Sequence, residues 1–309
     1  MQLKHTEAFN SLAIPPSEFQ PTVDFYPLCN DKVFKEIFSQ PMFVEELKLL
    51  ALVALAKDGY SLTDIQEIGY AKTEFTAPHA GGKAPRFDIN LDVVMTNGDN
   101  KYLNIEMQRK FATDYRERAE YYISVAVVDS LESGRLYNER SDIVGIHLLN
   151  HNMFKNADPN KYQYTFRFRE DDDHSLVLPL TPKIHFVELP KIRAMSQETI
   201  TNSPVLSVLK LISLEKKEEI MEYAQTNPPA QGLVDGVMAF NRDADNVKRV
   251  NYTELMVARE RIEGRAEGVL ETAMSMLQKG LLPELVAECT KLSLSRVRQL
   301  QTQLQLQPN

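Results

Sequence analysis

Apolar and polar positions alternate along the first two thirds of the chain with two different periods. Near the start, apolar side chains recur every three to four residues from about Asp31, a suitable N-cap, and predict an amphipathic helix through Val33, Phe34, Ile37 and Phe38. Pro41 interrupts this pattern, and a second helix is expected from about Met42 to Lys57, before Asp58-Gly59.

A period of two follows and predicts strands. Residues 87–95 and 102–108 alternate like the two arms of a β-hairpin. Helical spacing then returns between about 119 and 131. Three further segments have the apolar or alternating character of strands: 142–149, 162–168 and 183–189.

The pattern changes again near residue 195, beyond which only helical periodicity remains. Residues 1–30 contain four prolines and no periodicity, which indicates an arm or tail. We therefore predict an N-terminal arm (1–30), an α/β domain (31–195) and an α-helical C-terminal region (196–309).

The amino-acid composition limits the classes of protein that are compatible with the sequence. The 309 residues are 43% hydrophobic and 25% charged, as in a globular protein, and the net charge of −8 does not favour a general nucleic-acid coat. No signal segment and no apolar run of about 18 residues is recognised, so no membrane association is expected. The two cysteines, Cys29 and Cys289, are far apart, which excludes a zinc ribbon and favours the cytoplasm.

The hairpin carries the candidate chemistry. In its first arm Asp88, Asn90 and Asp92 lie on the face opposite the apolar residues, and in its second arm Glu106 and Gln108 do the same. A loop with an odd number of residues is needed to keep polar residues on one face of both arms.

A three-residue loop, Gly98-Asp99-Asn100, with Asn100 in the left-handed conformation, places Asp92 directly opposite Glu106. Two carboxylates at that separation repel each other unless a proton or a cation lies between them, and Mg²⁺ is a suitable cation. The pattern also permits a simpler reading, in which both acids lie on a solvated polar face.

These segments resemble a known nuclease superfamily. "LDV", "NIEMQ" and "RERAEYY" are similar to motifs of the PD-(D/E)XK nucleases, in particular the Rpn family of recombination-promoting nucleases, or putative transposases. The resemblance covers roughly residues 31–300. It implies an αβββαβ core, followed here by the α-helical C-terminal region, and DNA cleavage with Mg²⁺, for which Mn²⁺ is a substitute.

The resemblance also implies roles for individual residues. Asp92 and Glu106 correspond to the metal-binding acids, and Gln108 replaces the usual water-orienting lysine. A first-helix acid often contributes in the superfamily, and Glu36 is the candidate here. Leu91 stands where a proline usually precedes the aspartate, which is a departure from the superfamily pattern. An amide can orient water but cannot accept its proton, so catalysis is expected to be slower or to use a second metal ion.

Arginines outside the hairpin are candidates for DNA binding. Arg118 follows the hairpin closely enough to contact a phosphate, although a helix with a basic face gives the same pattern. Residues 282–300 resemble a helix-turn-helix with Lys291 in place of the turn glycine, in which Arg296 and Arg298 could touch DNA. Small helical pairs of this kind also serve packing or dimer contacts, so a homo-oligomer is possible.

Two hypotheses follow for the function. The first is a metal-dependent DNA endonuclease that hydrolyses phosphodiester bonds and is linked to recombination, mobile elements or phage defence, with Asp92, Glu106 and Gln108 as catalytic residues. The alternative is a non-catalytic DNA-binding or regulatory protein with a vestigial nuclease domain. The complete set of candidate side chains favours the enzyme.

Overall fold

The computed structural model describes residues 23–75, 84–131, 136–137, 140–178 and 180–305. Most of the predicted N-terminal arm, residues 1–22, lies outside this described part. Contacts between residues divide the chain into two units, one of which is Asp24–Val247. The other contains Lys248–Asn309.

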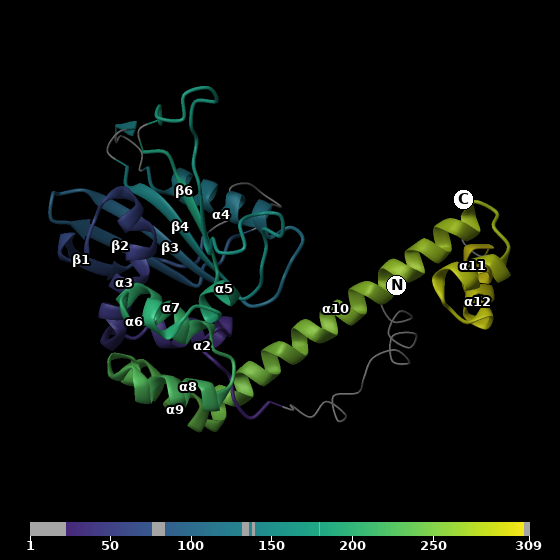
Figure 1. Ribbon diagram of the computed structural model, residues 1–309. Helices are drawn as coiled ribbons and strands as arrows, with labels where there is room; N and C mark the ends of the chain where they lie inside the picture. The colour runs from purple at the N-terminus through teal and green to yellow at the C-terminus, as the bar shows by residue number, and fades with distance from the viewer. Residues whose placement is uncertain (1–22, 76–83, 132–135, 138–139, 179, 306–309) are drawn as a thin grey trace. The chain divides into compact units, whose positions relative to one another are not determined.

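A six-stranded sheet forms the centre of the first unit (Figure 1). Its strand order is β1-β2-β3-β4-β6-β5, with β1 to β3 antiparallel, β3, β4 and β6 parallel, and β5 antiparallel to β6. The strands are β1 (Ile65–Tyr70), β2 (Ile89–Met95), β3 (Asn100–Gln108), β4 (Asp142–Leu149), β5 (Gln163–Phe166) and β6 (Lys183–Glu188).

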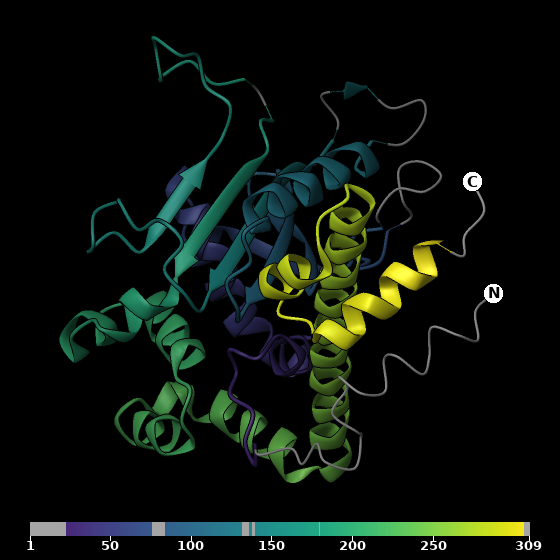
Figure 2. The same ribbon diagram turned by 90° about the vertical axis from the view of Figure 1, so that its right-hand side faces the viewer.

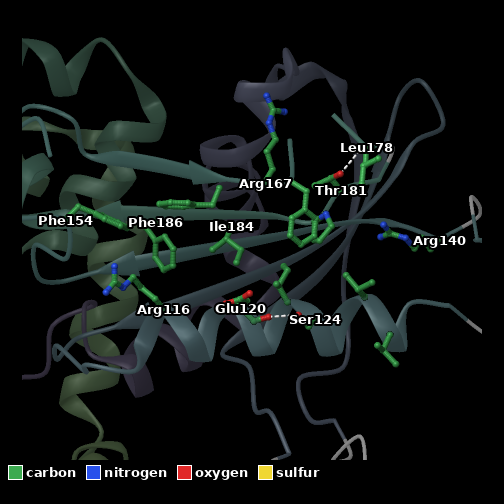
Figure 3. Close-up of a pocket in the computed structure, with 16 residues that line it drawn as sticks. Arg116, Glu120, Ser124, Arg140, Phe154, Arg167, Leu178, Thr181, Ile184 and Phe186 are labelled. Carbon is green, nitrogen blue, oxygen red and sulfur yellow. Dashed lines mark hydrogen bonds between the residues drawn. The ribbon is translucent and has the colours of Figure 1, made fainter. Parts of the chain in front are cut away.

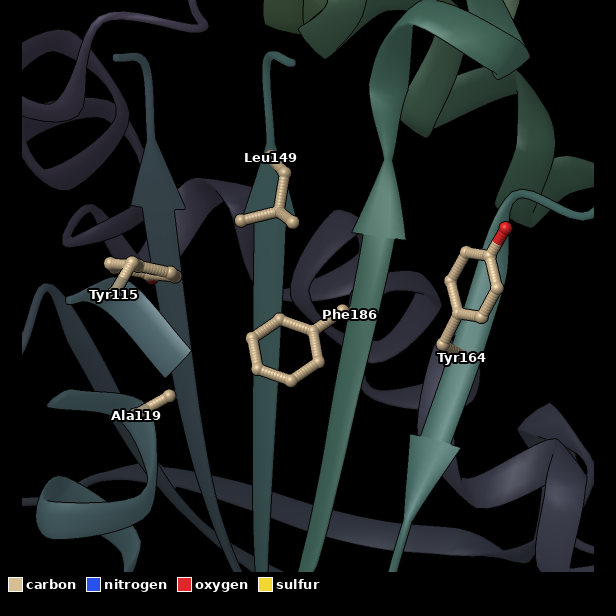
Figure 4. Close-up of a cluster of buried hydrophobic side chains, with 5 residues drawn as sticks. All are labelled: Tyr115, Ala119, Leu149, Tyr164 and Phe186. Carbon is tan, nitrogen blue, oxygen red and sulfur yellow. The ribbon is translucent and has the colours of Figure 1, made fainter. Parts of the chain in front are cut away.

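Helices cover both faces of this sheet. On one face lies α4 (Tyr115–Asp129), the crossover between the parallel strands β3 and β4; on the other lie α2 (Asp31–Phe38) and α3 (Val44–Leu55) (Figures 1 and 4). The order α2–α3, β1–β2–β3, α4, β4 is the predicted αβββαβ core, which is confirmed. The sequence did not reveal β1, because this edge strand exposes several residues and shows no clear alternation.

The α4 face of the sheet is packed mainly by aromatic side chains. Figure 4 shows the cluster that joins α4 to β4, β5 and β6, made of Tyr115, Ala119, Leu149, Tyr164 and Phe186. Toward the other end of α4, Ile123 and Ala126 pack on Ile143 of β4. These contacts fix α4 against β4, β5 and β6, and β4 lies next to β3 in the sheet.

Local chemistry sets the helix limits. The buried side chain of Asn30, rather than Asp31, caps α2 by accepting hydrogen bonds from the backbone N–H groups of Lys32 and Val33, at 3.0 and 3.4 Å. Pro41 lies in the short 3₁₀ turn Pro41–Phe43 that separates α2 from α3. Gly59, with φ of 91°, takes the left-handed conformation after the turn that follows α3.

Only helices follow β6 among the described residues. They are α5 (Leu189–Arg193), α6 (Gln197–Thr201), α7 (Pro204–Ser213), α8 (Lys217–Thr226), α9 (Gln231–Arg242), α10 (Ala244–Gln278), α11 (Pro283–Thr290) and α12 (Leu294–Gln305). The change of pattern near residue 195 coincides with the end of the sheet, whereas the first unit continues to Val247. No helix among the described residues has the length and apolar character needed to cross a membrane.

In the second unit, the end of α10 packs with α11 and α12 (Figure 2) around Ala273, Val286, Val297 and Leu300. Lys291 has a φ of 61°, so it adopts the left-handed conformation that the turn glycine of a helix-turn-helix normally supplies. Ala287 and Leu292 pack against the same cluster. Two short helices are therefore joined by a turn with a lysine in the left-handed position, and their identity as a helix-turn-helix stays a prediction.

Candidate active site

The hairpin between β2 and β3 has a different register from the predicted one. Asp92 pairs with Tyr102, not with Glu106, and lies next to Gly69 of β1 on its other side. The predicted contact between Asp92 and Glu106 is therefore wrong.

The turn explains this error. The loop has three residues, as predicted, but they are Thr96, Asn97 and Gly98, and Met95 and Asp99 flank it. Gly98, with φ of 86°, takes the left-handed position that the sequence pattern predicts for Asn100. The polar faces still match because the loop length stays odd. The loop lies two residues earlier in the chain, so the partner of Asp92 changes by four residues, from Glu106 to Tyr102.

In the observed register Glu106 meets Asp88. The backbone N–H of Asp88 donates to Glu106 Oε1 at 3.0 Å, and the backbone N–H of Met107 donates to Asp88 Oδ2 at 2.9 Å. Asn104 Nδ2 also donates to Glu106 Oε1, at 2.9 Å. Two carboxylates do meet on the polar face of the hairpin, but the partner of Glu106 is an aspartate that precedes β2.

Burial shifts the titration of both acids. The pKa of Glu106 rises to about 8, first because burial disfavours its charged form and then because the charge of Asp88 repels it. Burial likewise raises the pKa of Asp88 to about 6, opposed by its hydrogen bond from Met107 and by the charges of Lys35 and Lys32. The charge of Asp31, an acid of the first helix, raises the pKa of Asp88 further, whereas a role for Glu36 at this site stays a prediction.

The donor set fits a hard divalent cation. Within the described residues, Asp88 Oδ1 and Glu106 Oε2 make no hydrogen bond, so each carboxylate keeps one oxygen for another ligand. A cation between them would offset the repulsion by Asp88 that helps to raise the pKa of Glu106. The described chain offers no group of three or more acidic, histidine or cysteine side chains placed to hold a metal ion, so the pair would leave other coordination positions to water or substrate.

Gln108 and Arg118 form a second pair beside the acids. Arg118 Nη2 donates to Gln108 Oε1 at 2.7 Å, and Gln108 Nε2 donates to the carbonyl oxygen of Lys110. The guanidinium of Arg118 lies over the ring of Tyr115, 4.6 Å from its centroid, and its charge lowers the pKa of Glu106. Arg118 thus brings to this site the positive charge that a glutamine in place of a lysine cannot supply.

Tyr115 and His147 lie behind this pair. The buried Tyr115 hydroxyl and His147 Nδ1 are 3.0 Å apart and share a hydrogen bond. His147 lies beside Glu106 in the parallel register of β3 and β4. Burial lowers the pKa of His147 to about 3, so its ring is neutral at physiological pH. Gly145 makes room for this ring, since a Cβ at that position would lie 3.1 Å from His147 Nε2.

The sequence did not single out Asp88, Tyr115 or His147 for this site. Asp88 was visible on the polar face of the hairpin, and choosing it over Asp92 required only that Gly98, rather than Asn100, take the left-handed turn position. Nothing in the sequence indicates that Tyr115 and His147 approach Glu106, because their contact depends on how α4 packs on β4.

The other two predicted DNA contacts lie in the second unit, on α12. Arg298 Nη2 forms an exposed ion pair with Glu284 of α11 at 2.9 Å, and Arg296 donates to Gln299 at 3.1 Å. Exposed pairs of this kind contribute little to stability and exchange readily for other partners. Contact of these arginines with DNA stays a prediction.

Comparison with known proteins agrees with the fold. The sequence model of a family described as PD-(D/E)XK nuclease family transposase matches residues 28–257, which include the whole sheet and the acid pair. No curated protein and no solved structure matches the chain. The match ends before α11 and α12, short of the limit near residue 300 expected from the sequence. The chain belongs to the PD-(D/E)XK nuclease transposase family.

Proposed function

We propose that this protein is a Mg²⁺-dependent DNA endonuclease, with Mn²⁺ as an effective substitute. The observation that carries the proposal is the pairing of Asp88 with Glu106, a half-buried and a buried carboxylate that each keep one oxygen without a hydrogen bond among the described residues. Membership of a nuclease transposase family supports the reaction class, that of a nuclease, and DNA as its substrate is part of the proposal.

Asp88 and Glu106 would hold the metal ion, and we assign to Asp88 the role that the sequence suggested for Asp92. When bound, the ion polarises the scissile phosphate and lowers the pKa of a bound water molecule. Backbone N–H groups fix one oxygen of each acid, at 3.0 and 2.9 Å, and the other oxygen of each would be the metal ligand. The two acids would thus set where the metal ion, and the phosphate that it contacts, lie.

Gln108 would orient the attacking water rather than accept its proton. Its amide is held at both ends, by Arg118 and by the carbonyl of Lys110, and its oxygen keeps a second lone pair for a water hydrogen. An amide is not a base at neutral pH, so the proton passes to solvent or to a phosphate oxygen. Arg118 would lie close enough to stabilise the charge that develops on the phosphate.

The helical region that follows Lys248 would contribute DNA contacts through Arg296 and Arg298, or self-association. A role in recombination, mobility of DNA elements or phage defence, as in the Rpn family, belongs to the same proposal, as does location in the cytoplasm.

Different metal ions should support DNA binding and DNA cleavage to different extents. After treatment with a chelator, the protein should nick supercoiled plasmid when Mg²⁺ is restored, and at least as fast with Mn²⁺, which tolerates imperfect geometry. Ca²⁺ prefers more ligands at longer distances, so it should support DNA binding but little cleavage. Zn²⁺ should be poor because the site has no thiolate or imidazole ligand. Plasmid nicking and a parallel DNA titration measure the two steps.

Full cleavage in chelator without added metal would rule out a metal-dependent mechanism. DNA binding without cleavage under any of these metals would support the alternative, a regulatory protein with a vestigial nuclease domain.

A further inference from the structure

Figure 3 shows a pocket of about 730 Å³ that is lined by residues of α4 and of the sheet. It lies on the same face of the sheet as Glu106, because Glu106, His147 and Phe186 are neighbours in the strand register and Phe186 lines the pocket. It is bounded by α4, by β5 and β6, and by the segments that follow β5 and precede β6. Its volume is typical of cavities that bind small molecules or single nucleotides and is too small for a DNA duplex. The site proposed above does not use it.

Aromatic rings form much of its wall. Phe154, Phe166, Phe168 and Phe186 all line the pocket. Phe154 and Phe166 are stacked, with centroids 5.7 Å apart and an interplanar angle of 26°. Phe166 and Phe168 are 48% and 64% exposed, so part of each side chain is accessible to a ligand. Accessible aromatic rings favour a flat partner, and a nucleobase of any identity can stack on them.

Cationic groups accompany the rings. Arg116, Arg140 and Arg167 line the pocket, against one acid, Glu120. Two carbonyl oxygens, of Ser141 and Leu180, hold Arg140. Arg116 and Arg167 make no hydrogen bond or ion pair within the described residues. An apolar protein segment docked here would desolvate these charges without compensation, whereas a phosphate would pair with them.

A layer of aromatic side chains separates the pocket from the acid pair. Phe186 contributes to the pocket wall and also contacts His147, at 5.2 Å between centroids, and Tyr115, at 6.5 Å. His147 pairs with Glu106 in the sheet register, and Tyr115 lies under Arg118. Both sites thus lie along α4, and a single strand of nucleic acid crossing this face could reach both.

We propose that this pocket binds an unpaired nucleotide of the DNA strand that is cut. Its base stacks on Phe166 and Phe168, and the flanking phosphates contact Arg116 and Arg167. A base that is already unpaired avoids the cost of unstacking, so the enzyme prefers single-stranded, bulged or frayed DNA to a perfect duplex. This inference rests on the proposed function only in taking DNA as the substrate.

The test measures binding with 2-aminopurine as the unpaired base, in Ca²⁺, so that cleavage does not interfere. Three probes are compared: a single strand, a duplex with one bulged 2-aminopurine and a fully paired duplex of the same sequence. The wild-type protein should bind the first two at least about 10-fold more tightly than the paired duplex, with a change in 2-aminopurine emission on stacking.

Two variants address the pocket, each with a matched control from the same segment. Phe168→Ala and Arg167→Gln should each weaken binding of the bulged probe about 10-fold, or more, and leave paired-duplex binding unchanged. Leu176→Ala and Arg169→Gln remove an exposed apolar side chain and an exposed arginine that do not line the pocket, and should have no effect. All four positions are exposed, so circular dichroism should show unaltered folding.

Several outcomes would overturn the inference: equal affinity for the bulged and paired probes, no binding of either, or unchanged binding by both pocket variants. So would a change in molecular mass by light scattering with Phe168→Ala that leaves DNA binding intact, because it would identify the surface as a contact between copies of the chain. Competition by free deoxynucleoside monophosphate as strong as by the bulged DNA would likewise exclude a DNA strand as the occupant. Failure of the proposed nuclease function would give a different result, because the wild-type protein would then not nick plasmid DNA in a metal-dependent way.

Discussion

Replacing Asp88 by asparagine should reduce DNA cleavage at least about 1,000-fold, whereas the same replacement of Asp92 should leave the rate within about 3-fold of wild type. A loss of that size corresponds to about 4 kcal/mol of transition-state stabilisation, as expected when a metal ligand is removed. The difference follows from the strand register, which sets Asp88 against Glu106 and Asp92 against Tyr102. The measurement is the single-turnover rate of plasmid nicking at saturating Mg²⁺.

Asp92→Asn is a closely matched control, because Asp92 lies on the same face of the same hairpin arm, four residues away. Both variants should be purified by the same protocol, so that any contaminating nuclease contributes equally. An inactive Asp92 variant beside an active Asp88 variant would show that the assignment drawn from the register is wrong.

Replacing Glu106 by glutamine should abolish cleavage and, in metal-free buffer, stabilise the folded protein at alkaline pH. The folded-state pKa of Glu106 is raised to about 8, above the ordinary value of 4.5. Between these two values the folded protein keeps a proton that the unfolded chain releases, so the free energy of unfolding falls as pH rises through this window. Because glutamine does not titrate, the free energy of unfolding of the variant does not fall in this way.

The variant should therefore match the wild type near pH 4.5 and exceed it by about 1–3 kcal/mol at pH 9. That difference raises Tm by several degrees, since each kcal/mol shifts Tm by about 2–4 °C in a protein of this size. Thermal melting in chelator at the two pH values measures it. Added Mg²⁺ should then stabilise the wild type and not the variant. A variant that melts below the wild type at pH 9 would contradict the idea that these acids repel each other in the metal-free fold.

Much of the fold was predictable because it rests on local periodicity. The strand predicted at 142–149 coincides with β4, since its buried residues are mostly apolar and are interrupted only by His147 after the first position. The prediction of which hairpin residues share the polar face was also correct, because the alternation of side chains depends only on the strand period. The edge strand β1 escaped recognition, as its exposure removes the alternation.

The site itself was only partly predictable. Glu106, Gln108 and Arg118 lie together, as their order along the chain suggested. The choice between Asp88 and Asp92 depended on which residue took the left-handed turn position, a local preference that displaces every cross-strand pair. The contacts of Arg118 with Gln108 and of Tyr115 with His147 depend on the packing of α4 against the sheet. The hydrophobic periodicity of the sequence does not indicate how α4 packs against the sheet.

Calorimetric titration of Mn²⁺ into the chelator-treated protein tests most directly the claim that Asp88 and Glu106 form a metal site. Repeating it at pH 7 in two buffers of different ionisation enthalpy counts the protons released on binding. Because Glu106 holds a proton at pH 7 in the metal-free protein, the wild type should bind Mn²⁺ with release of about one proton. Asp88→Asn and Glu106→Gln should both lose this binding, and Asp92→Asn should retain it. Binding that survives in the Asp88 and Glu106 variants, or no binding by the wild type, would contradict the account.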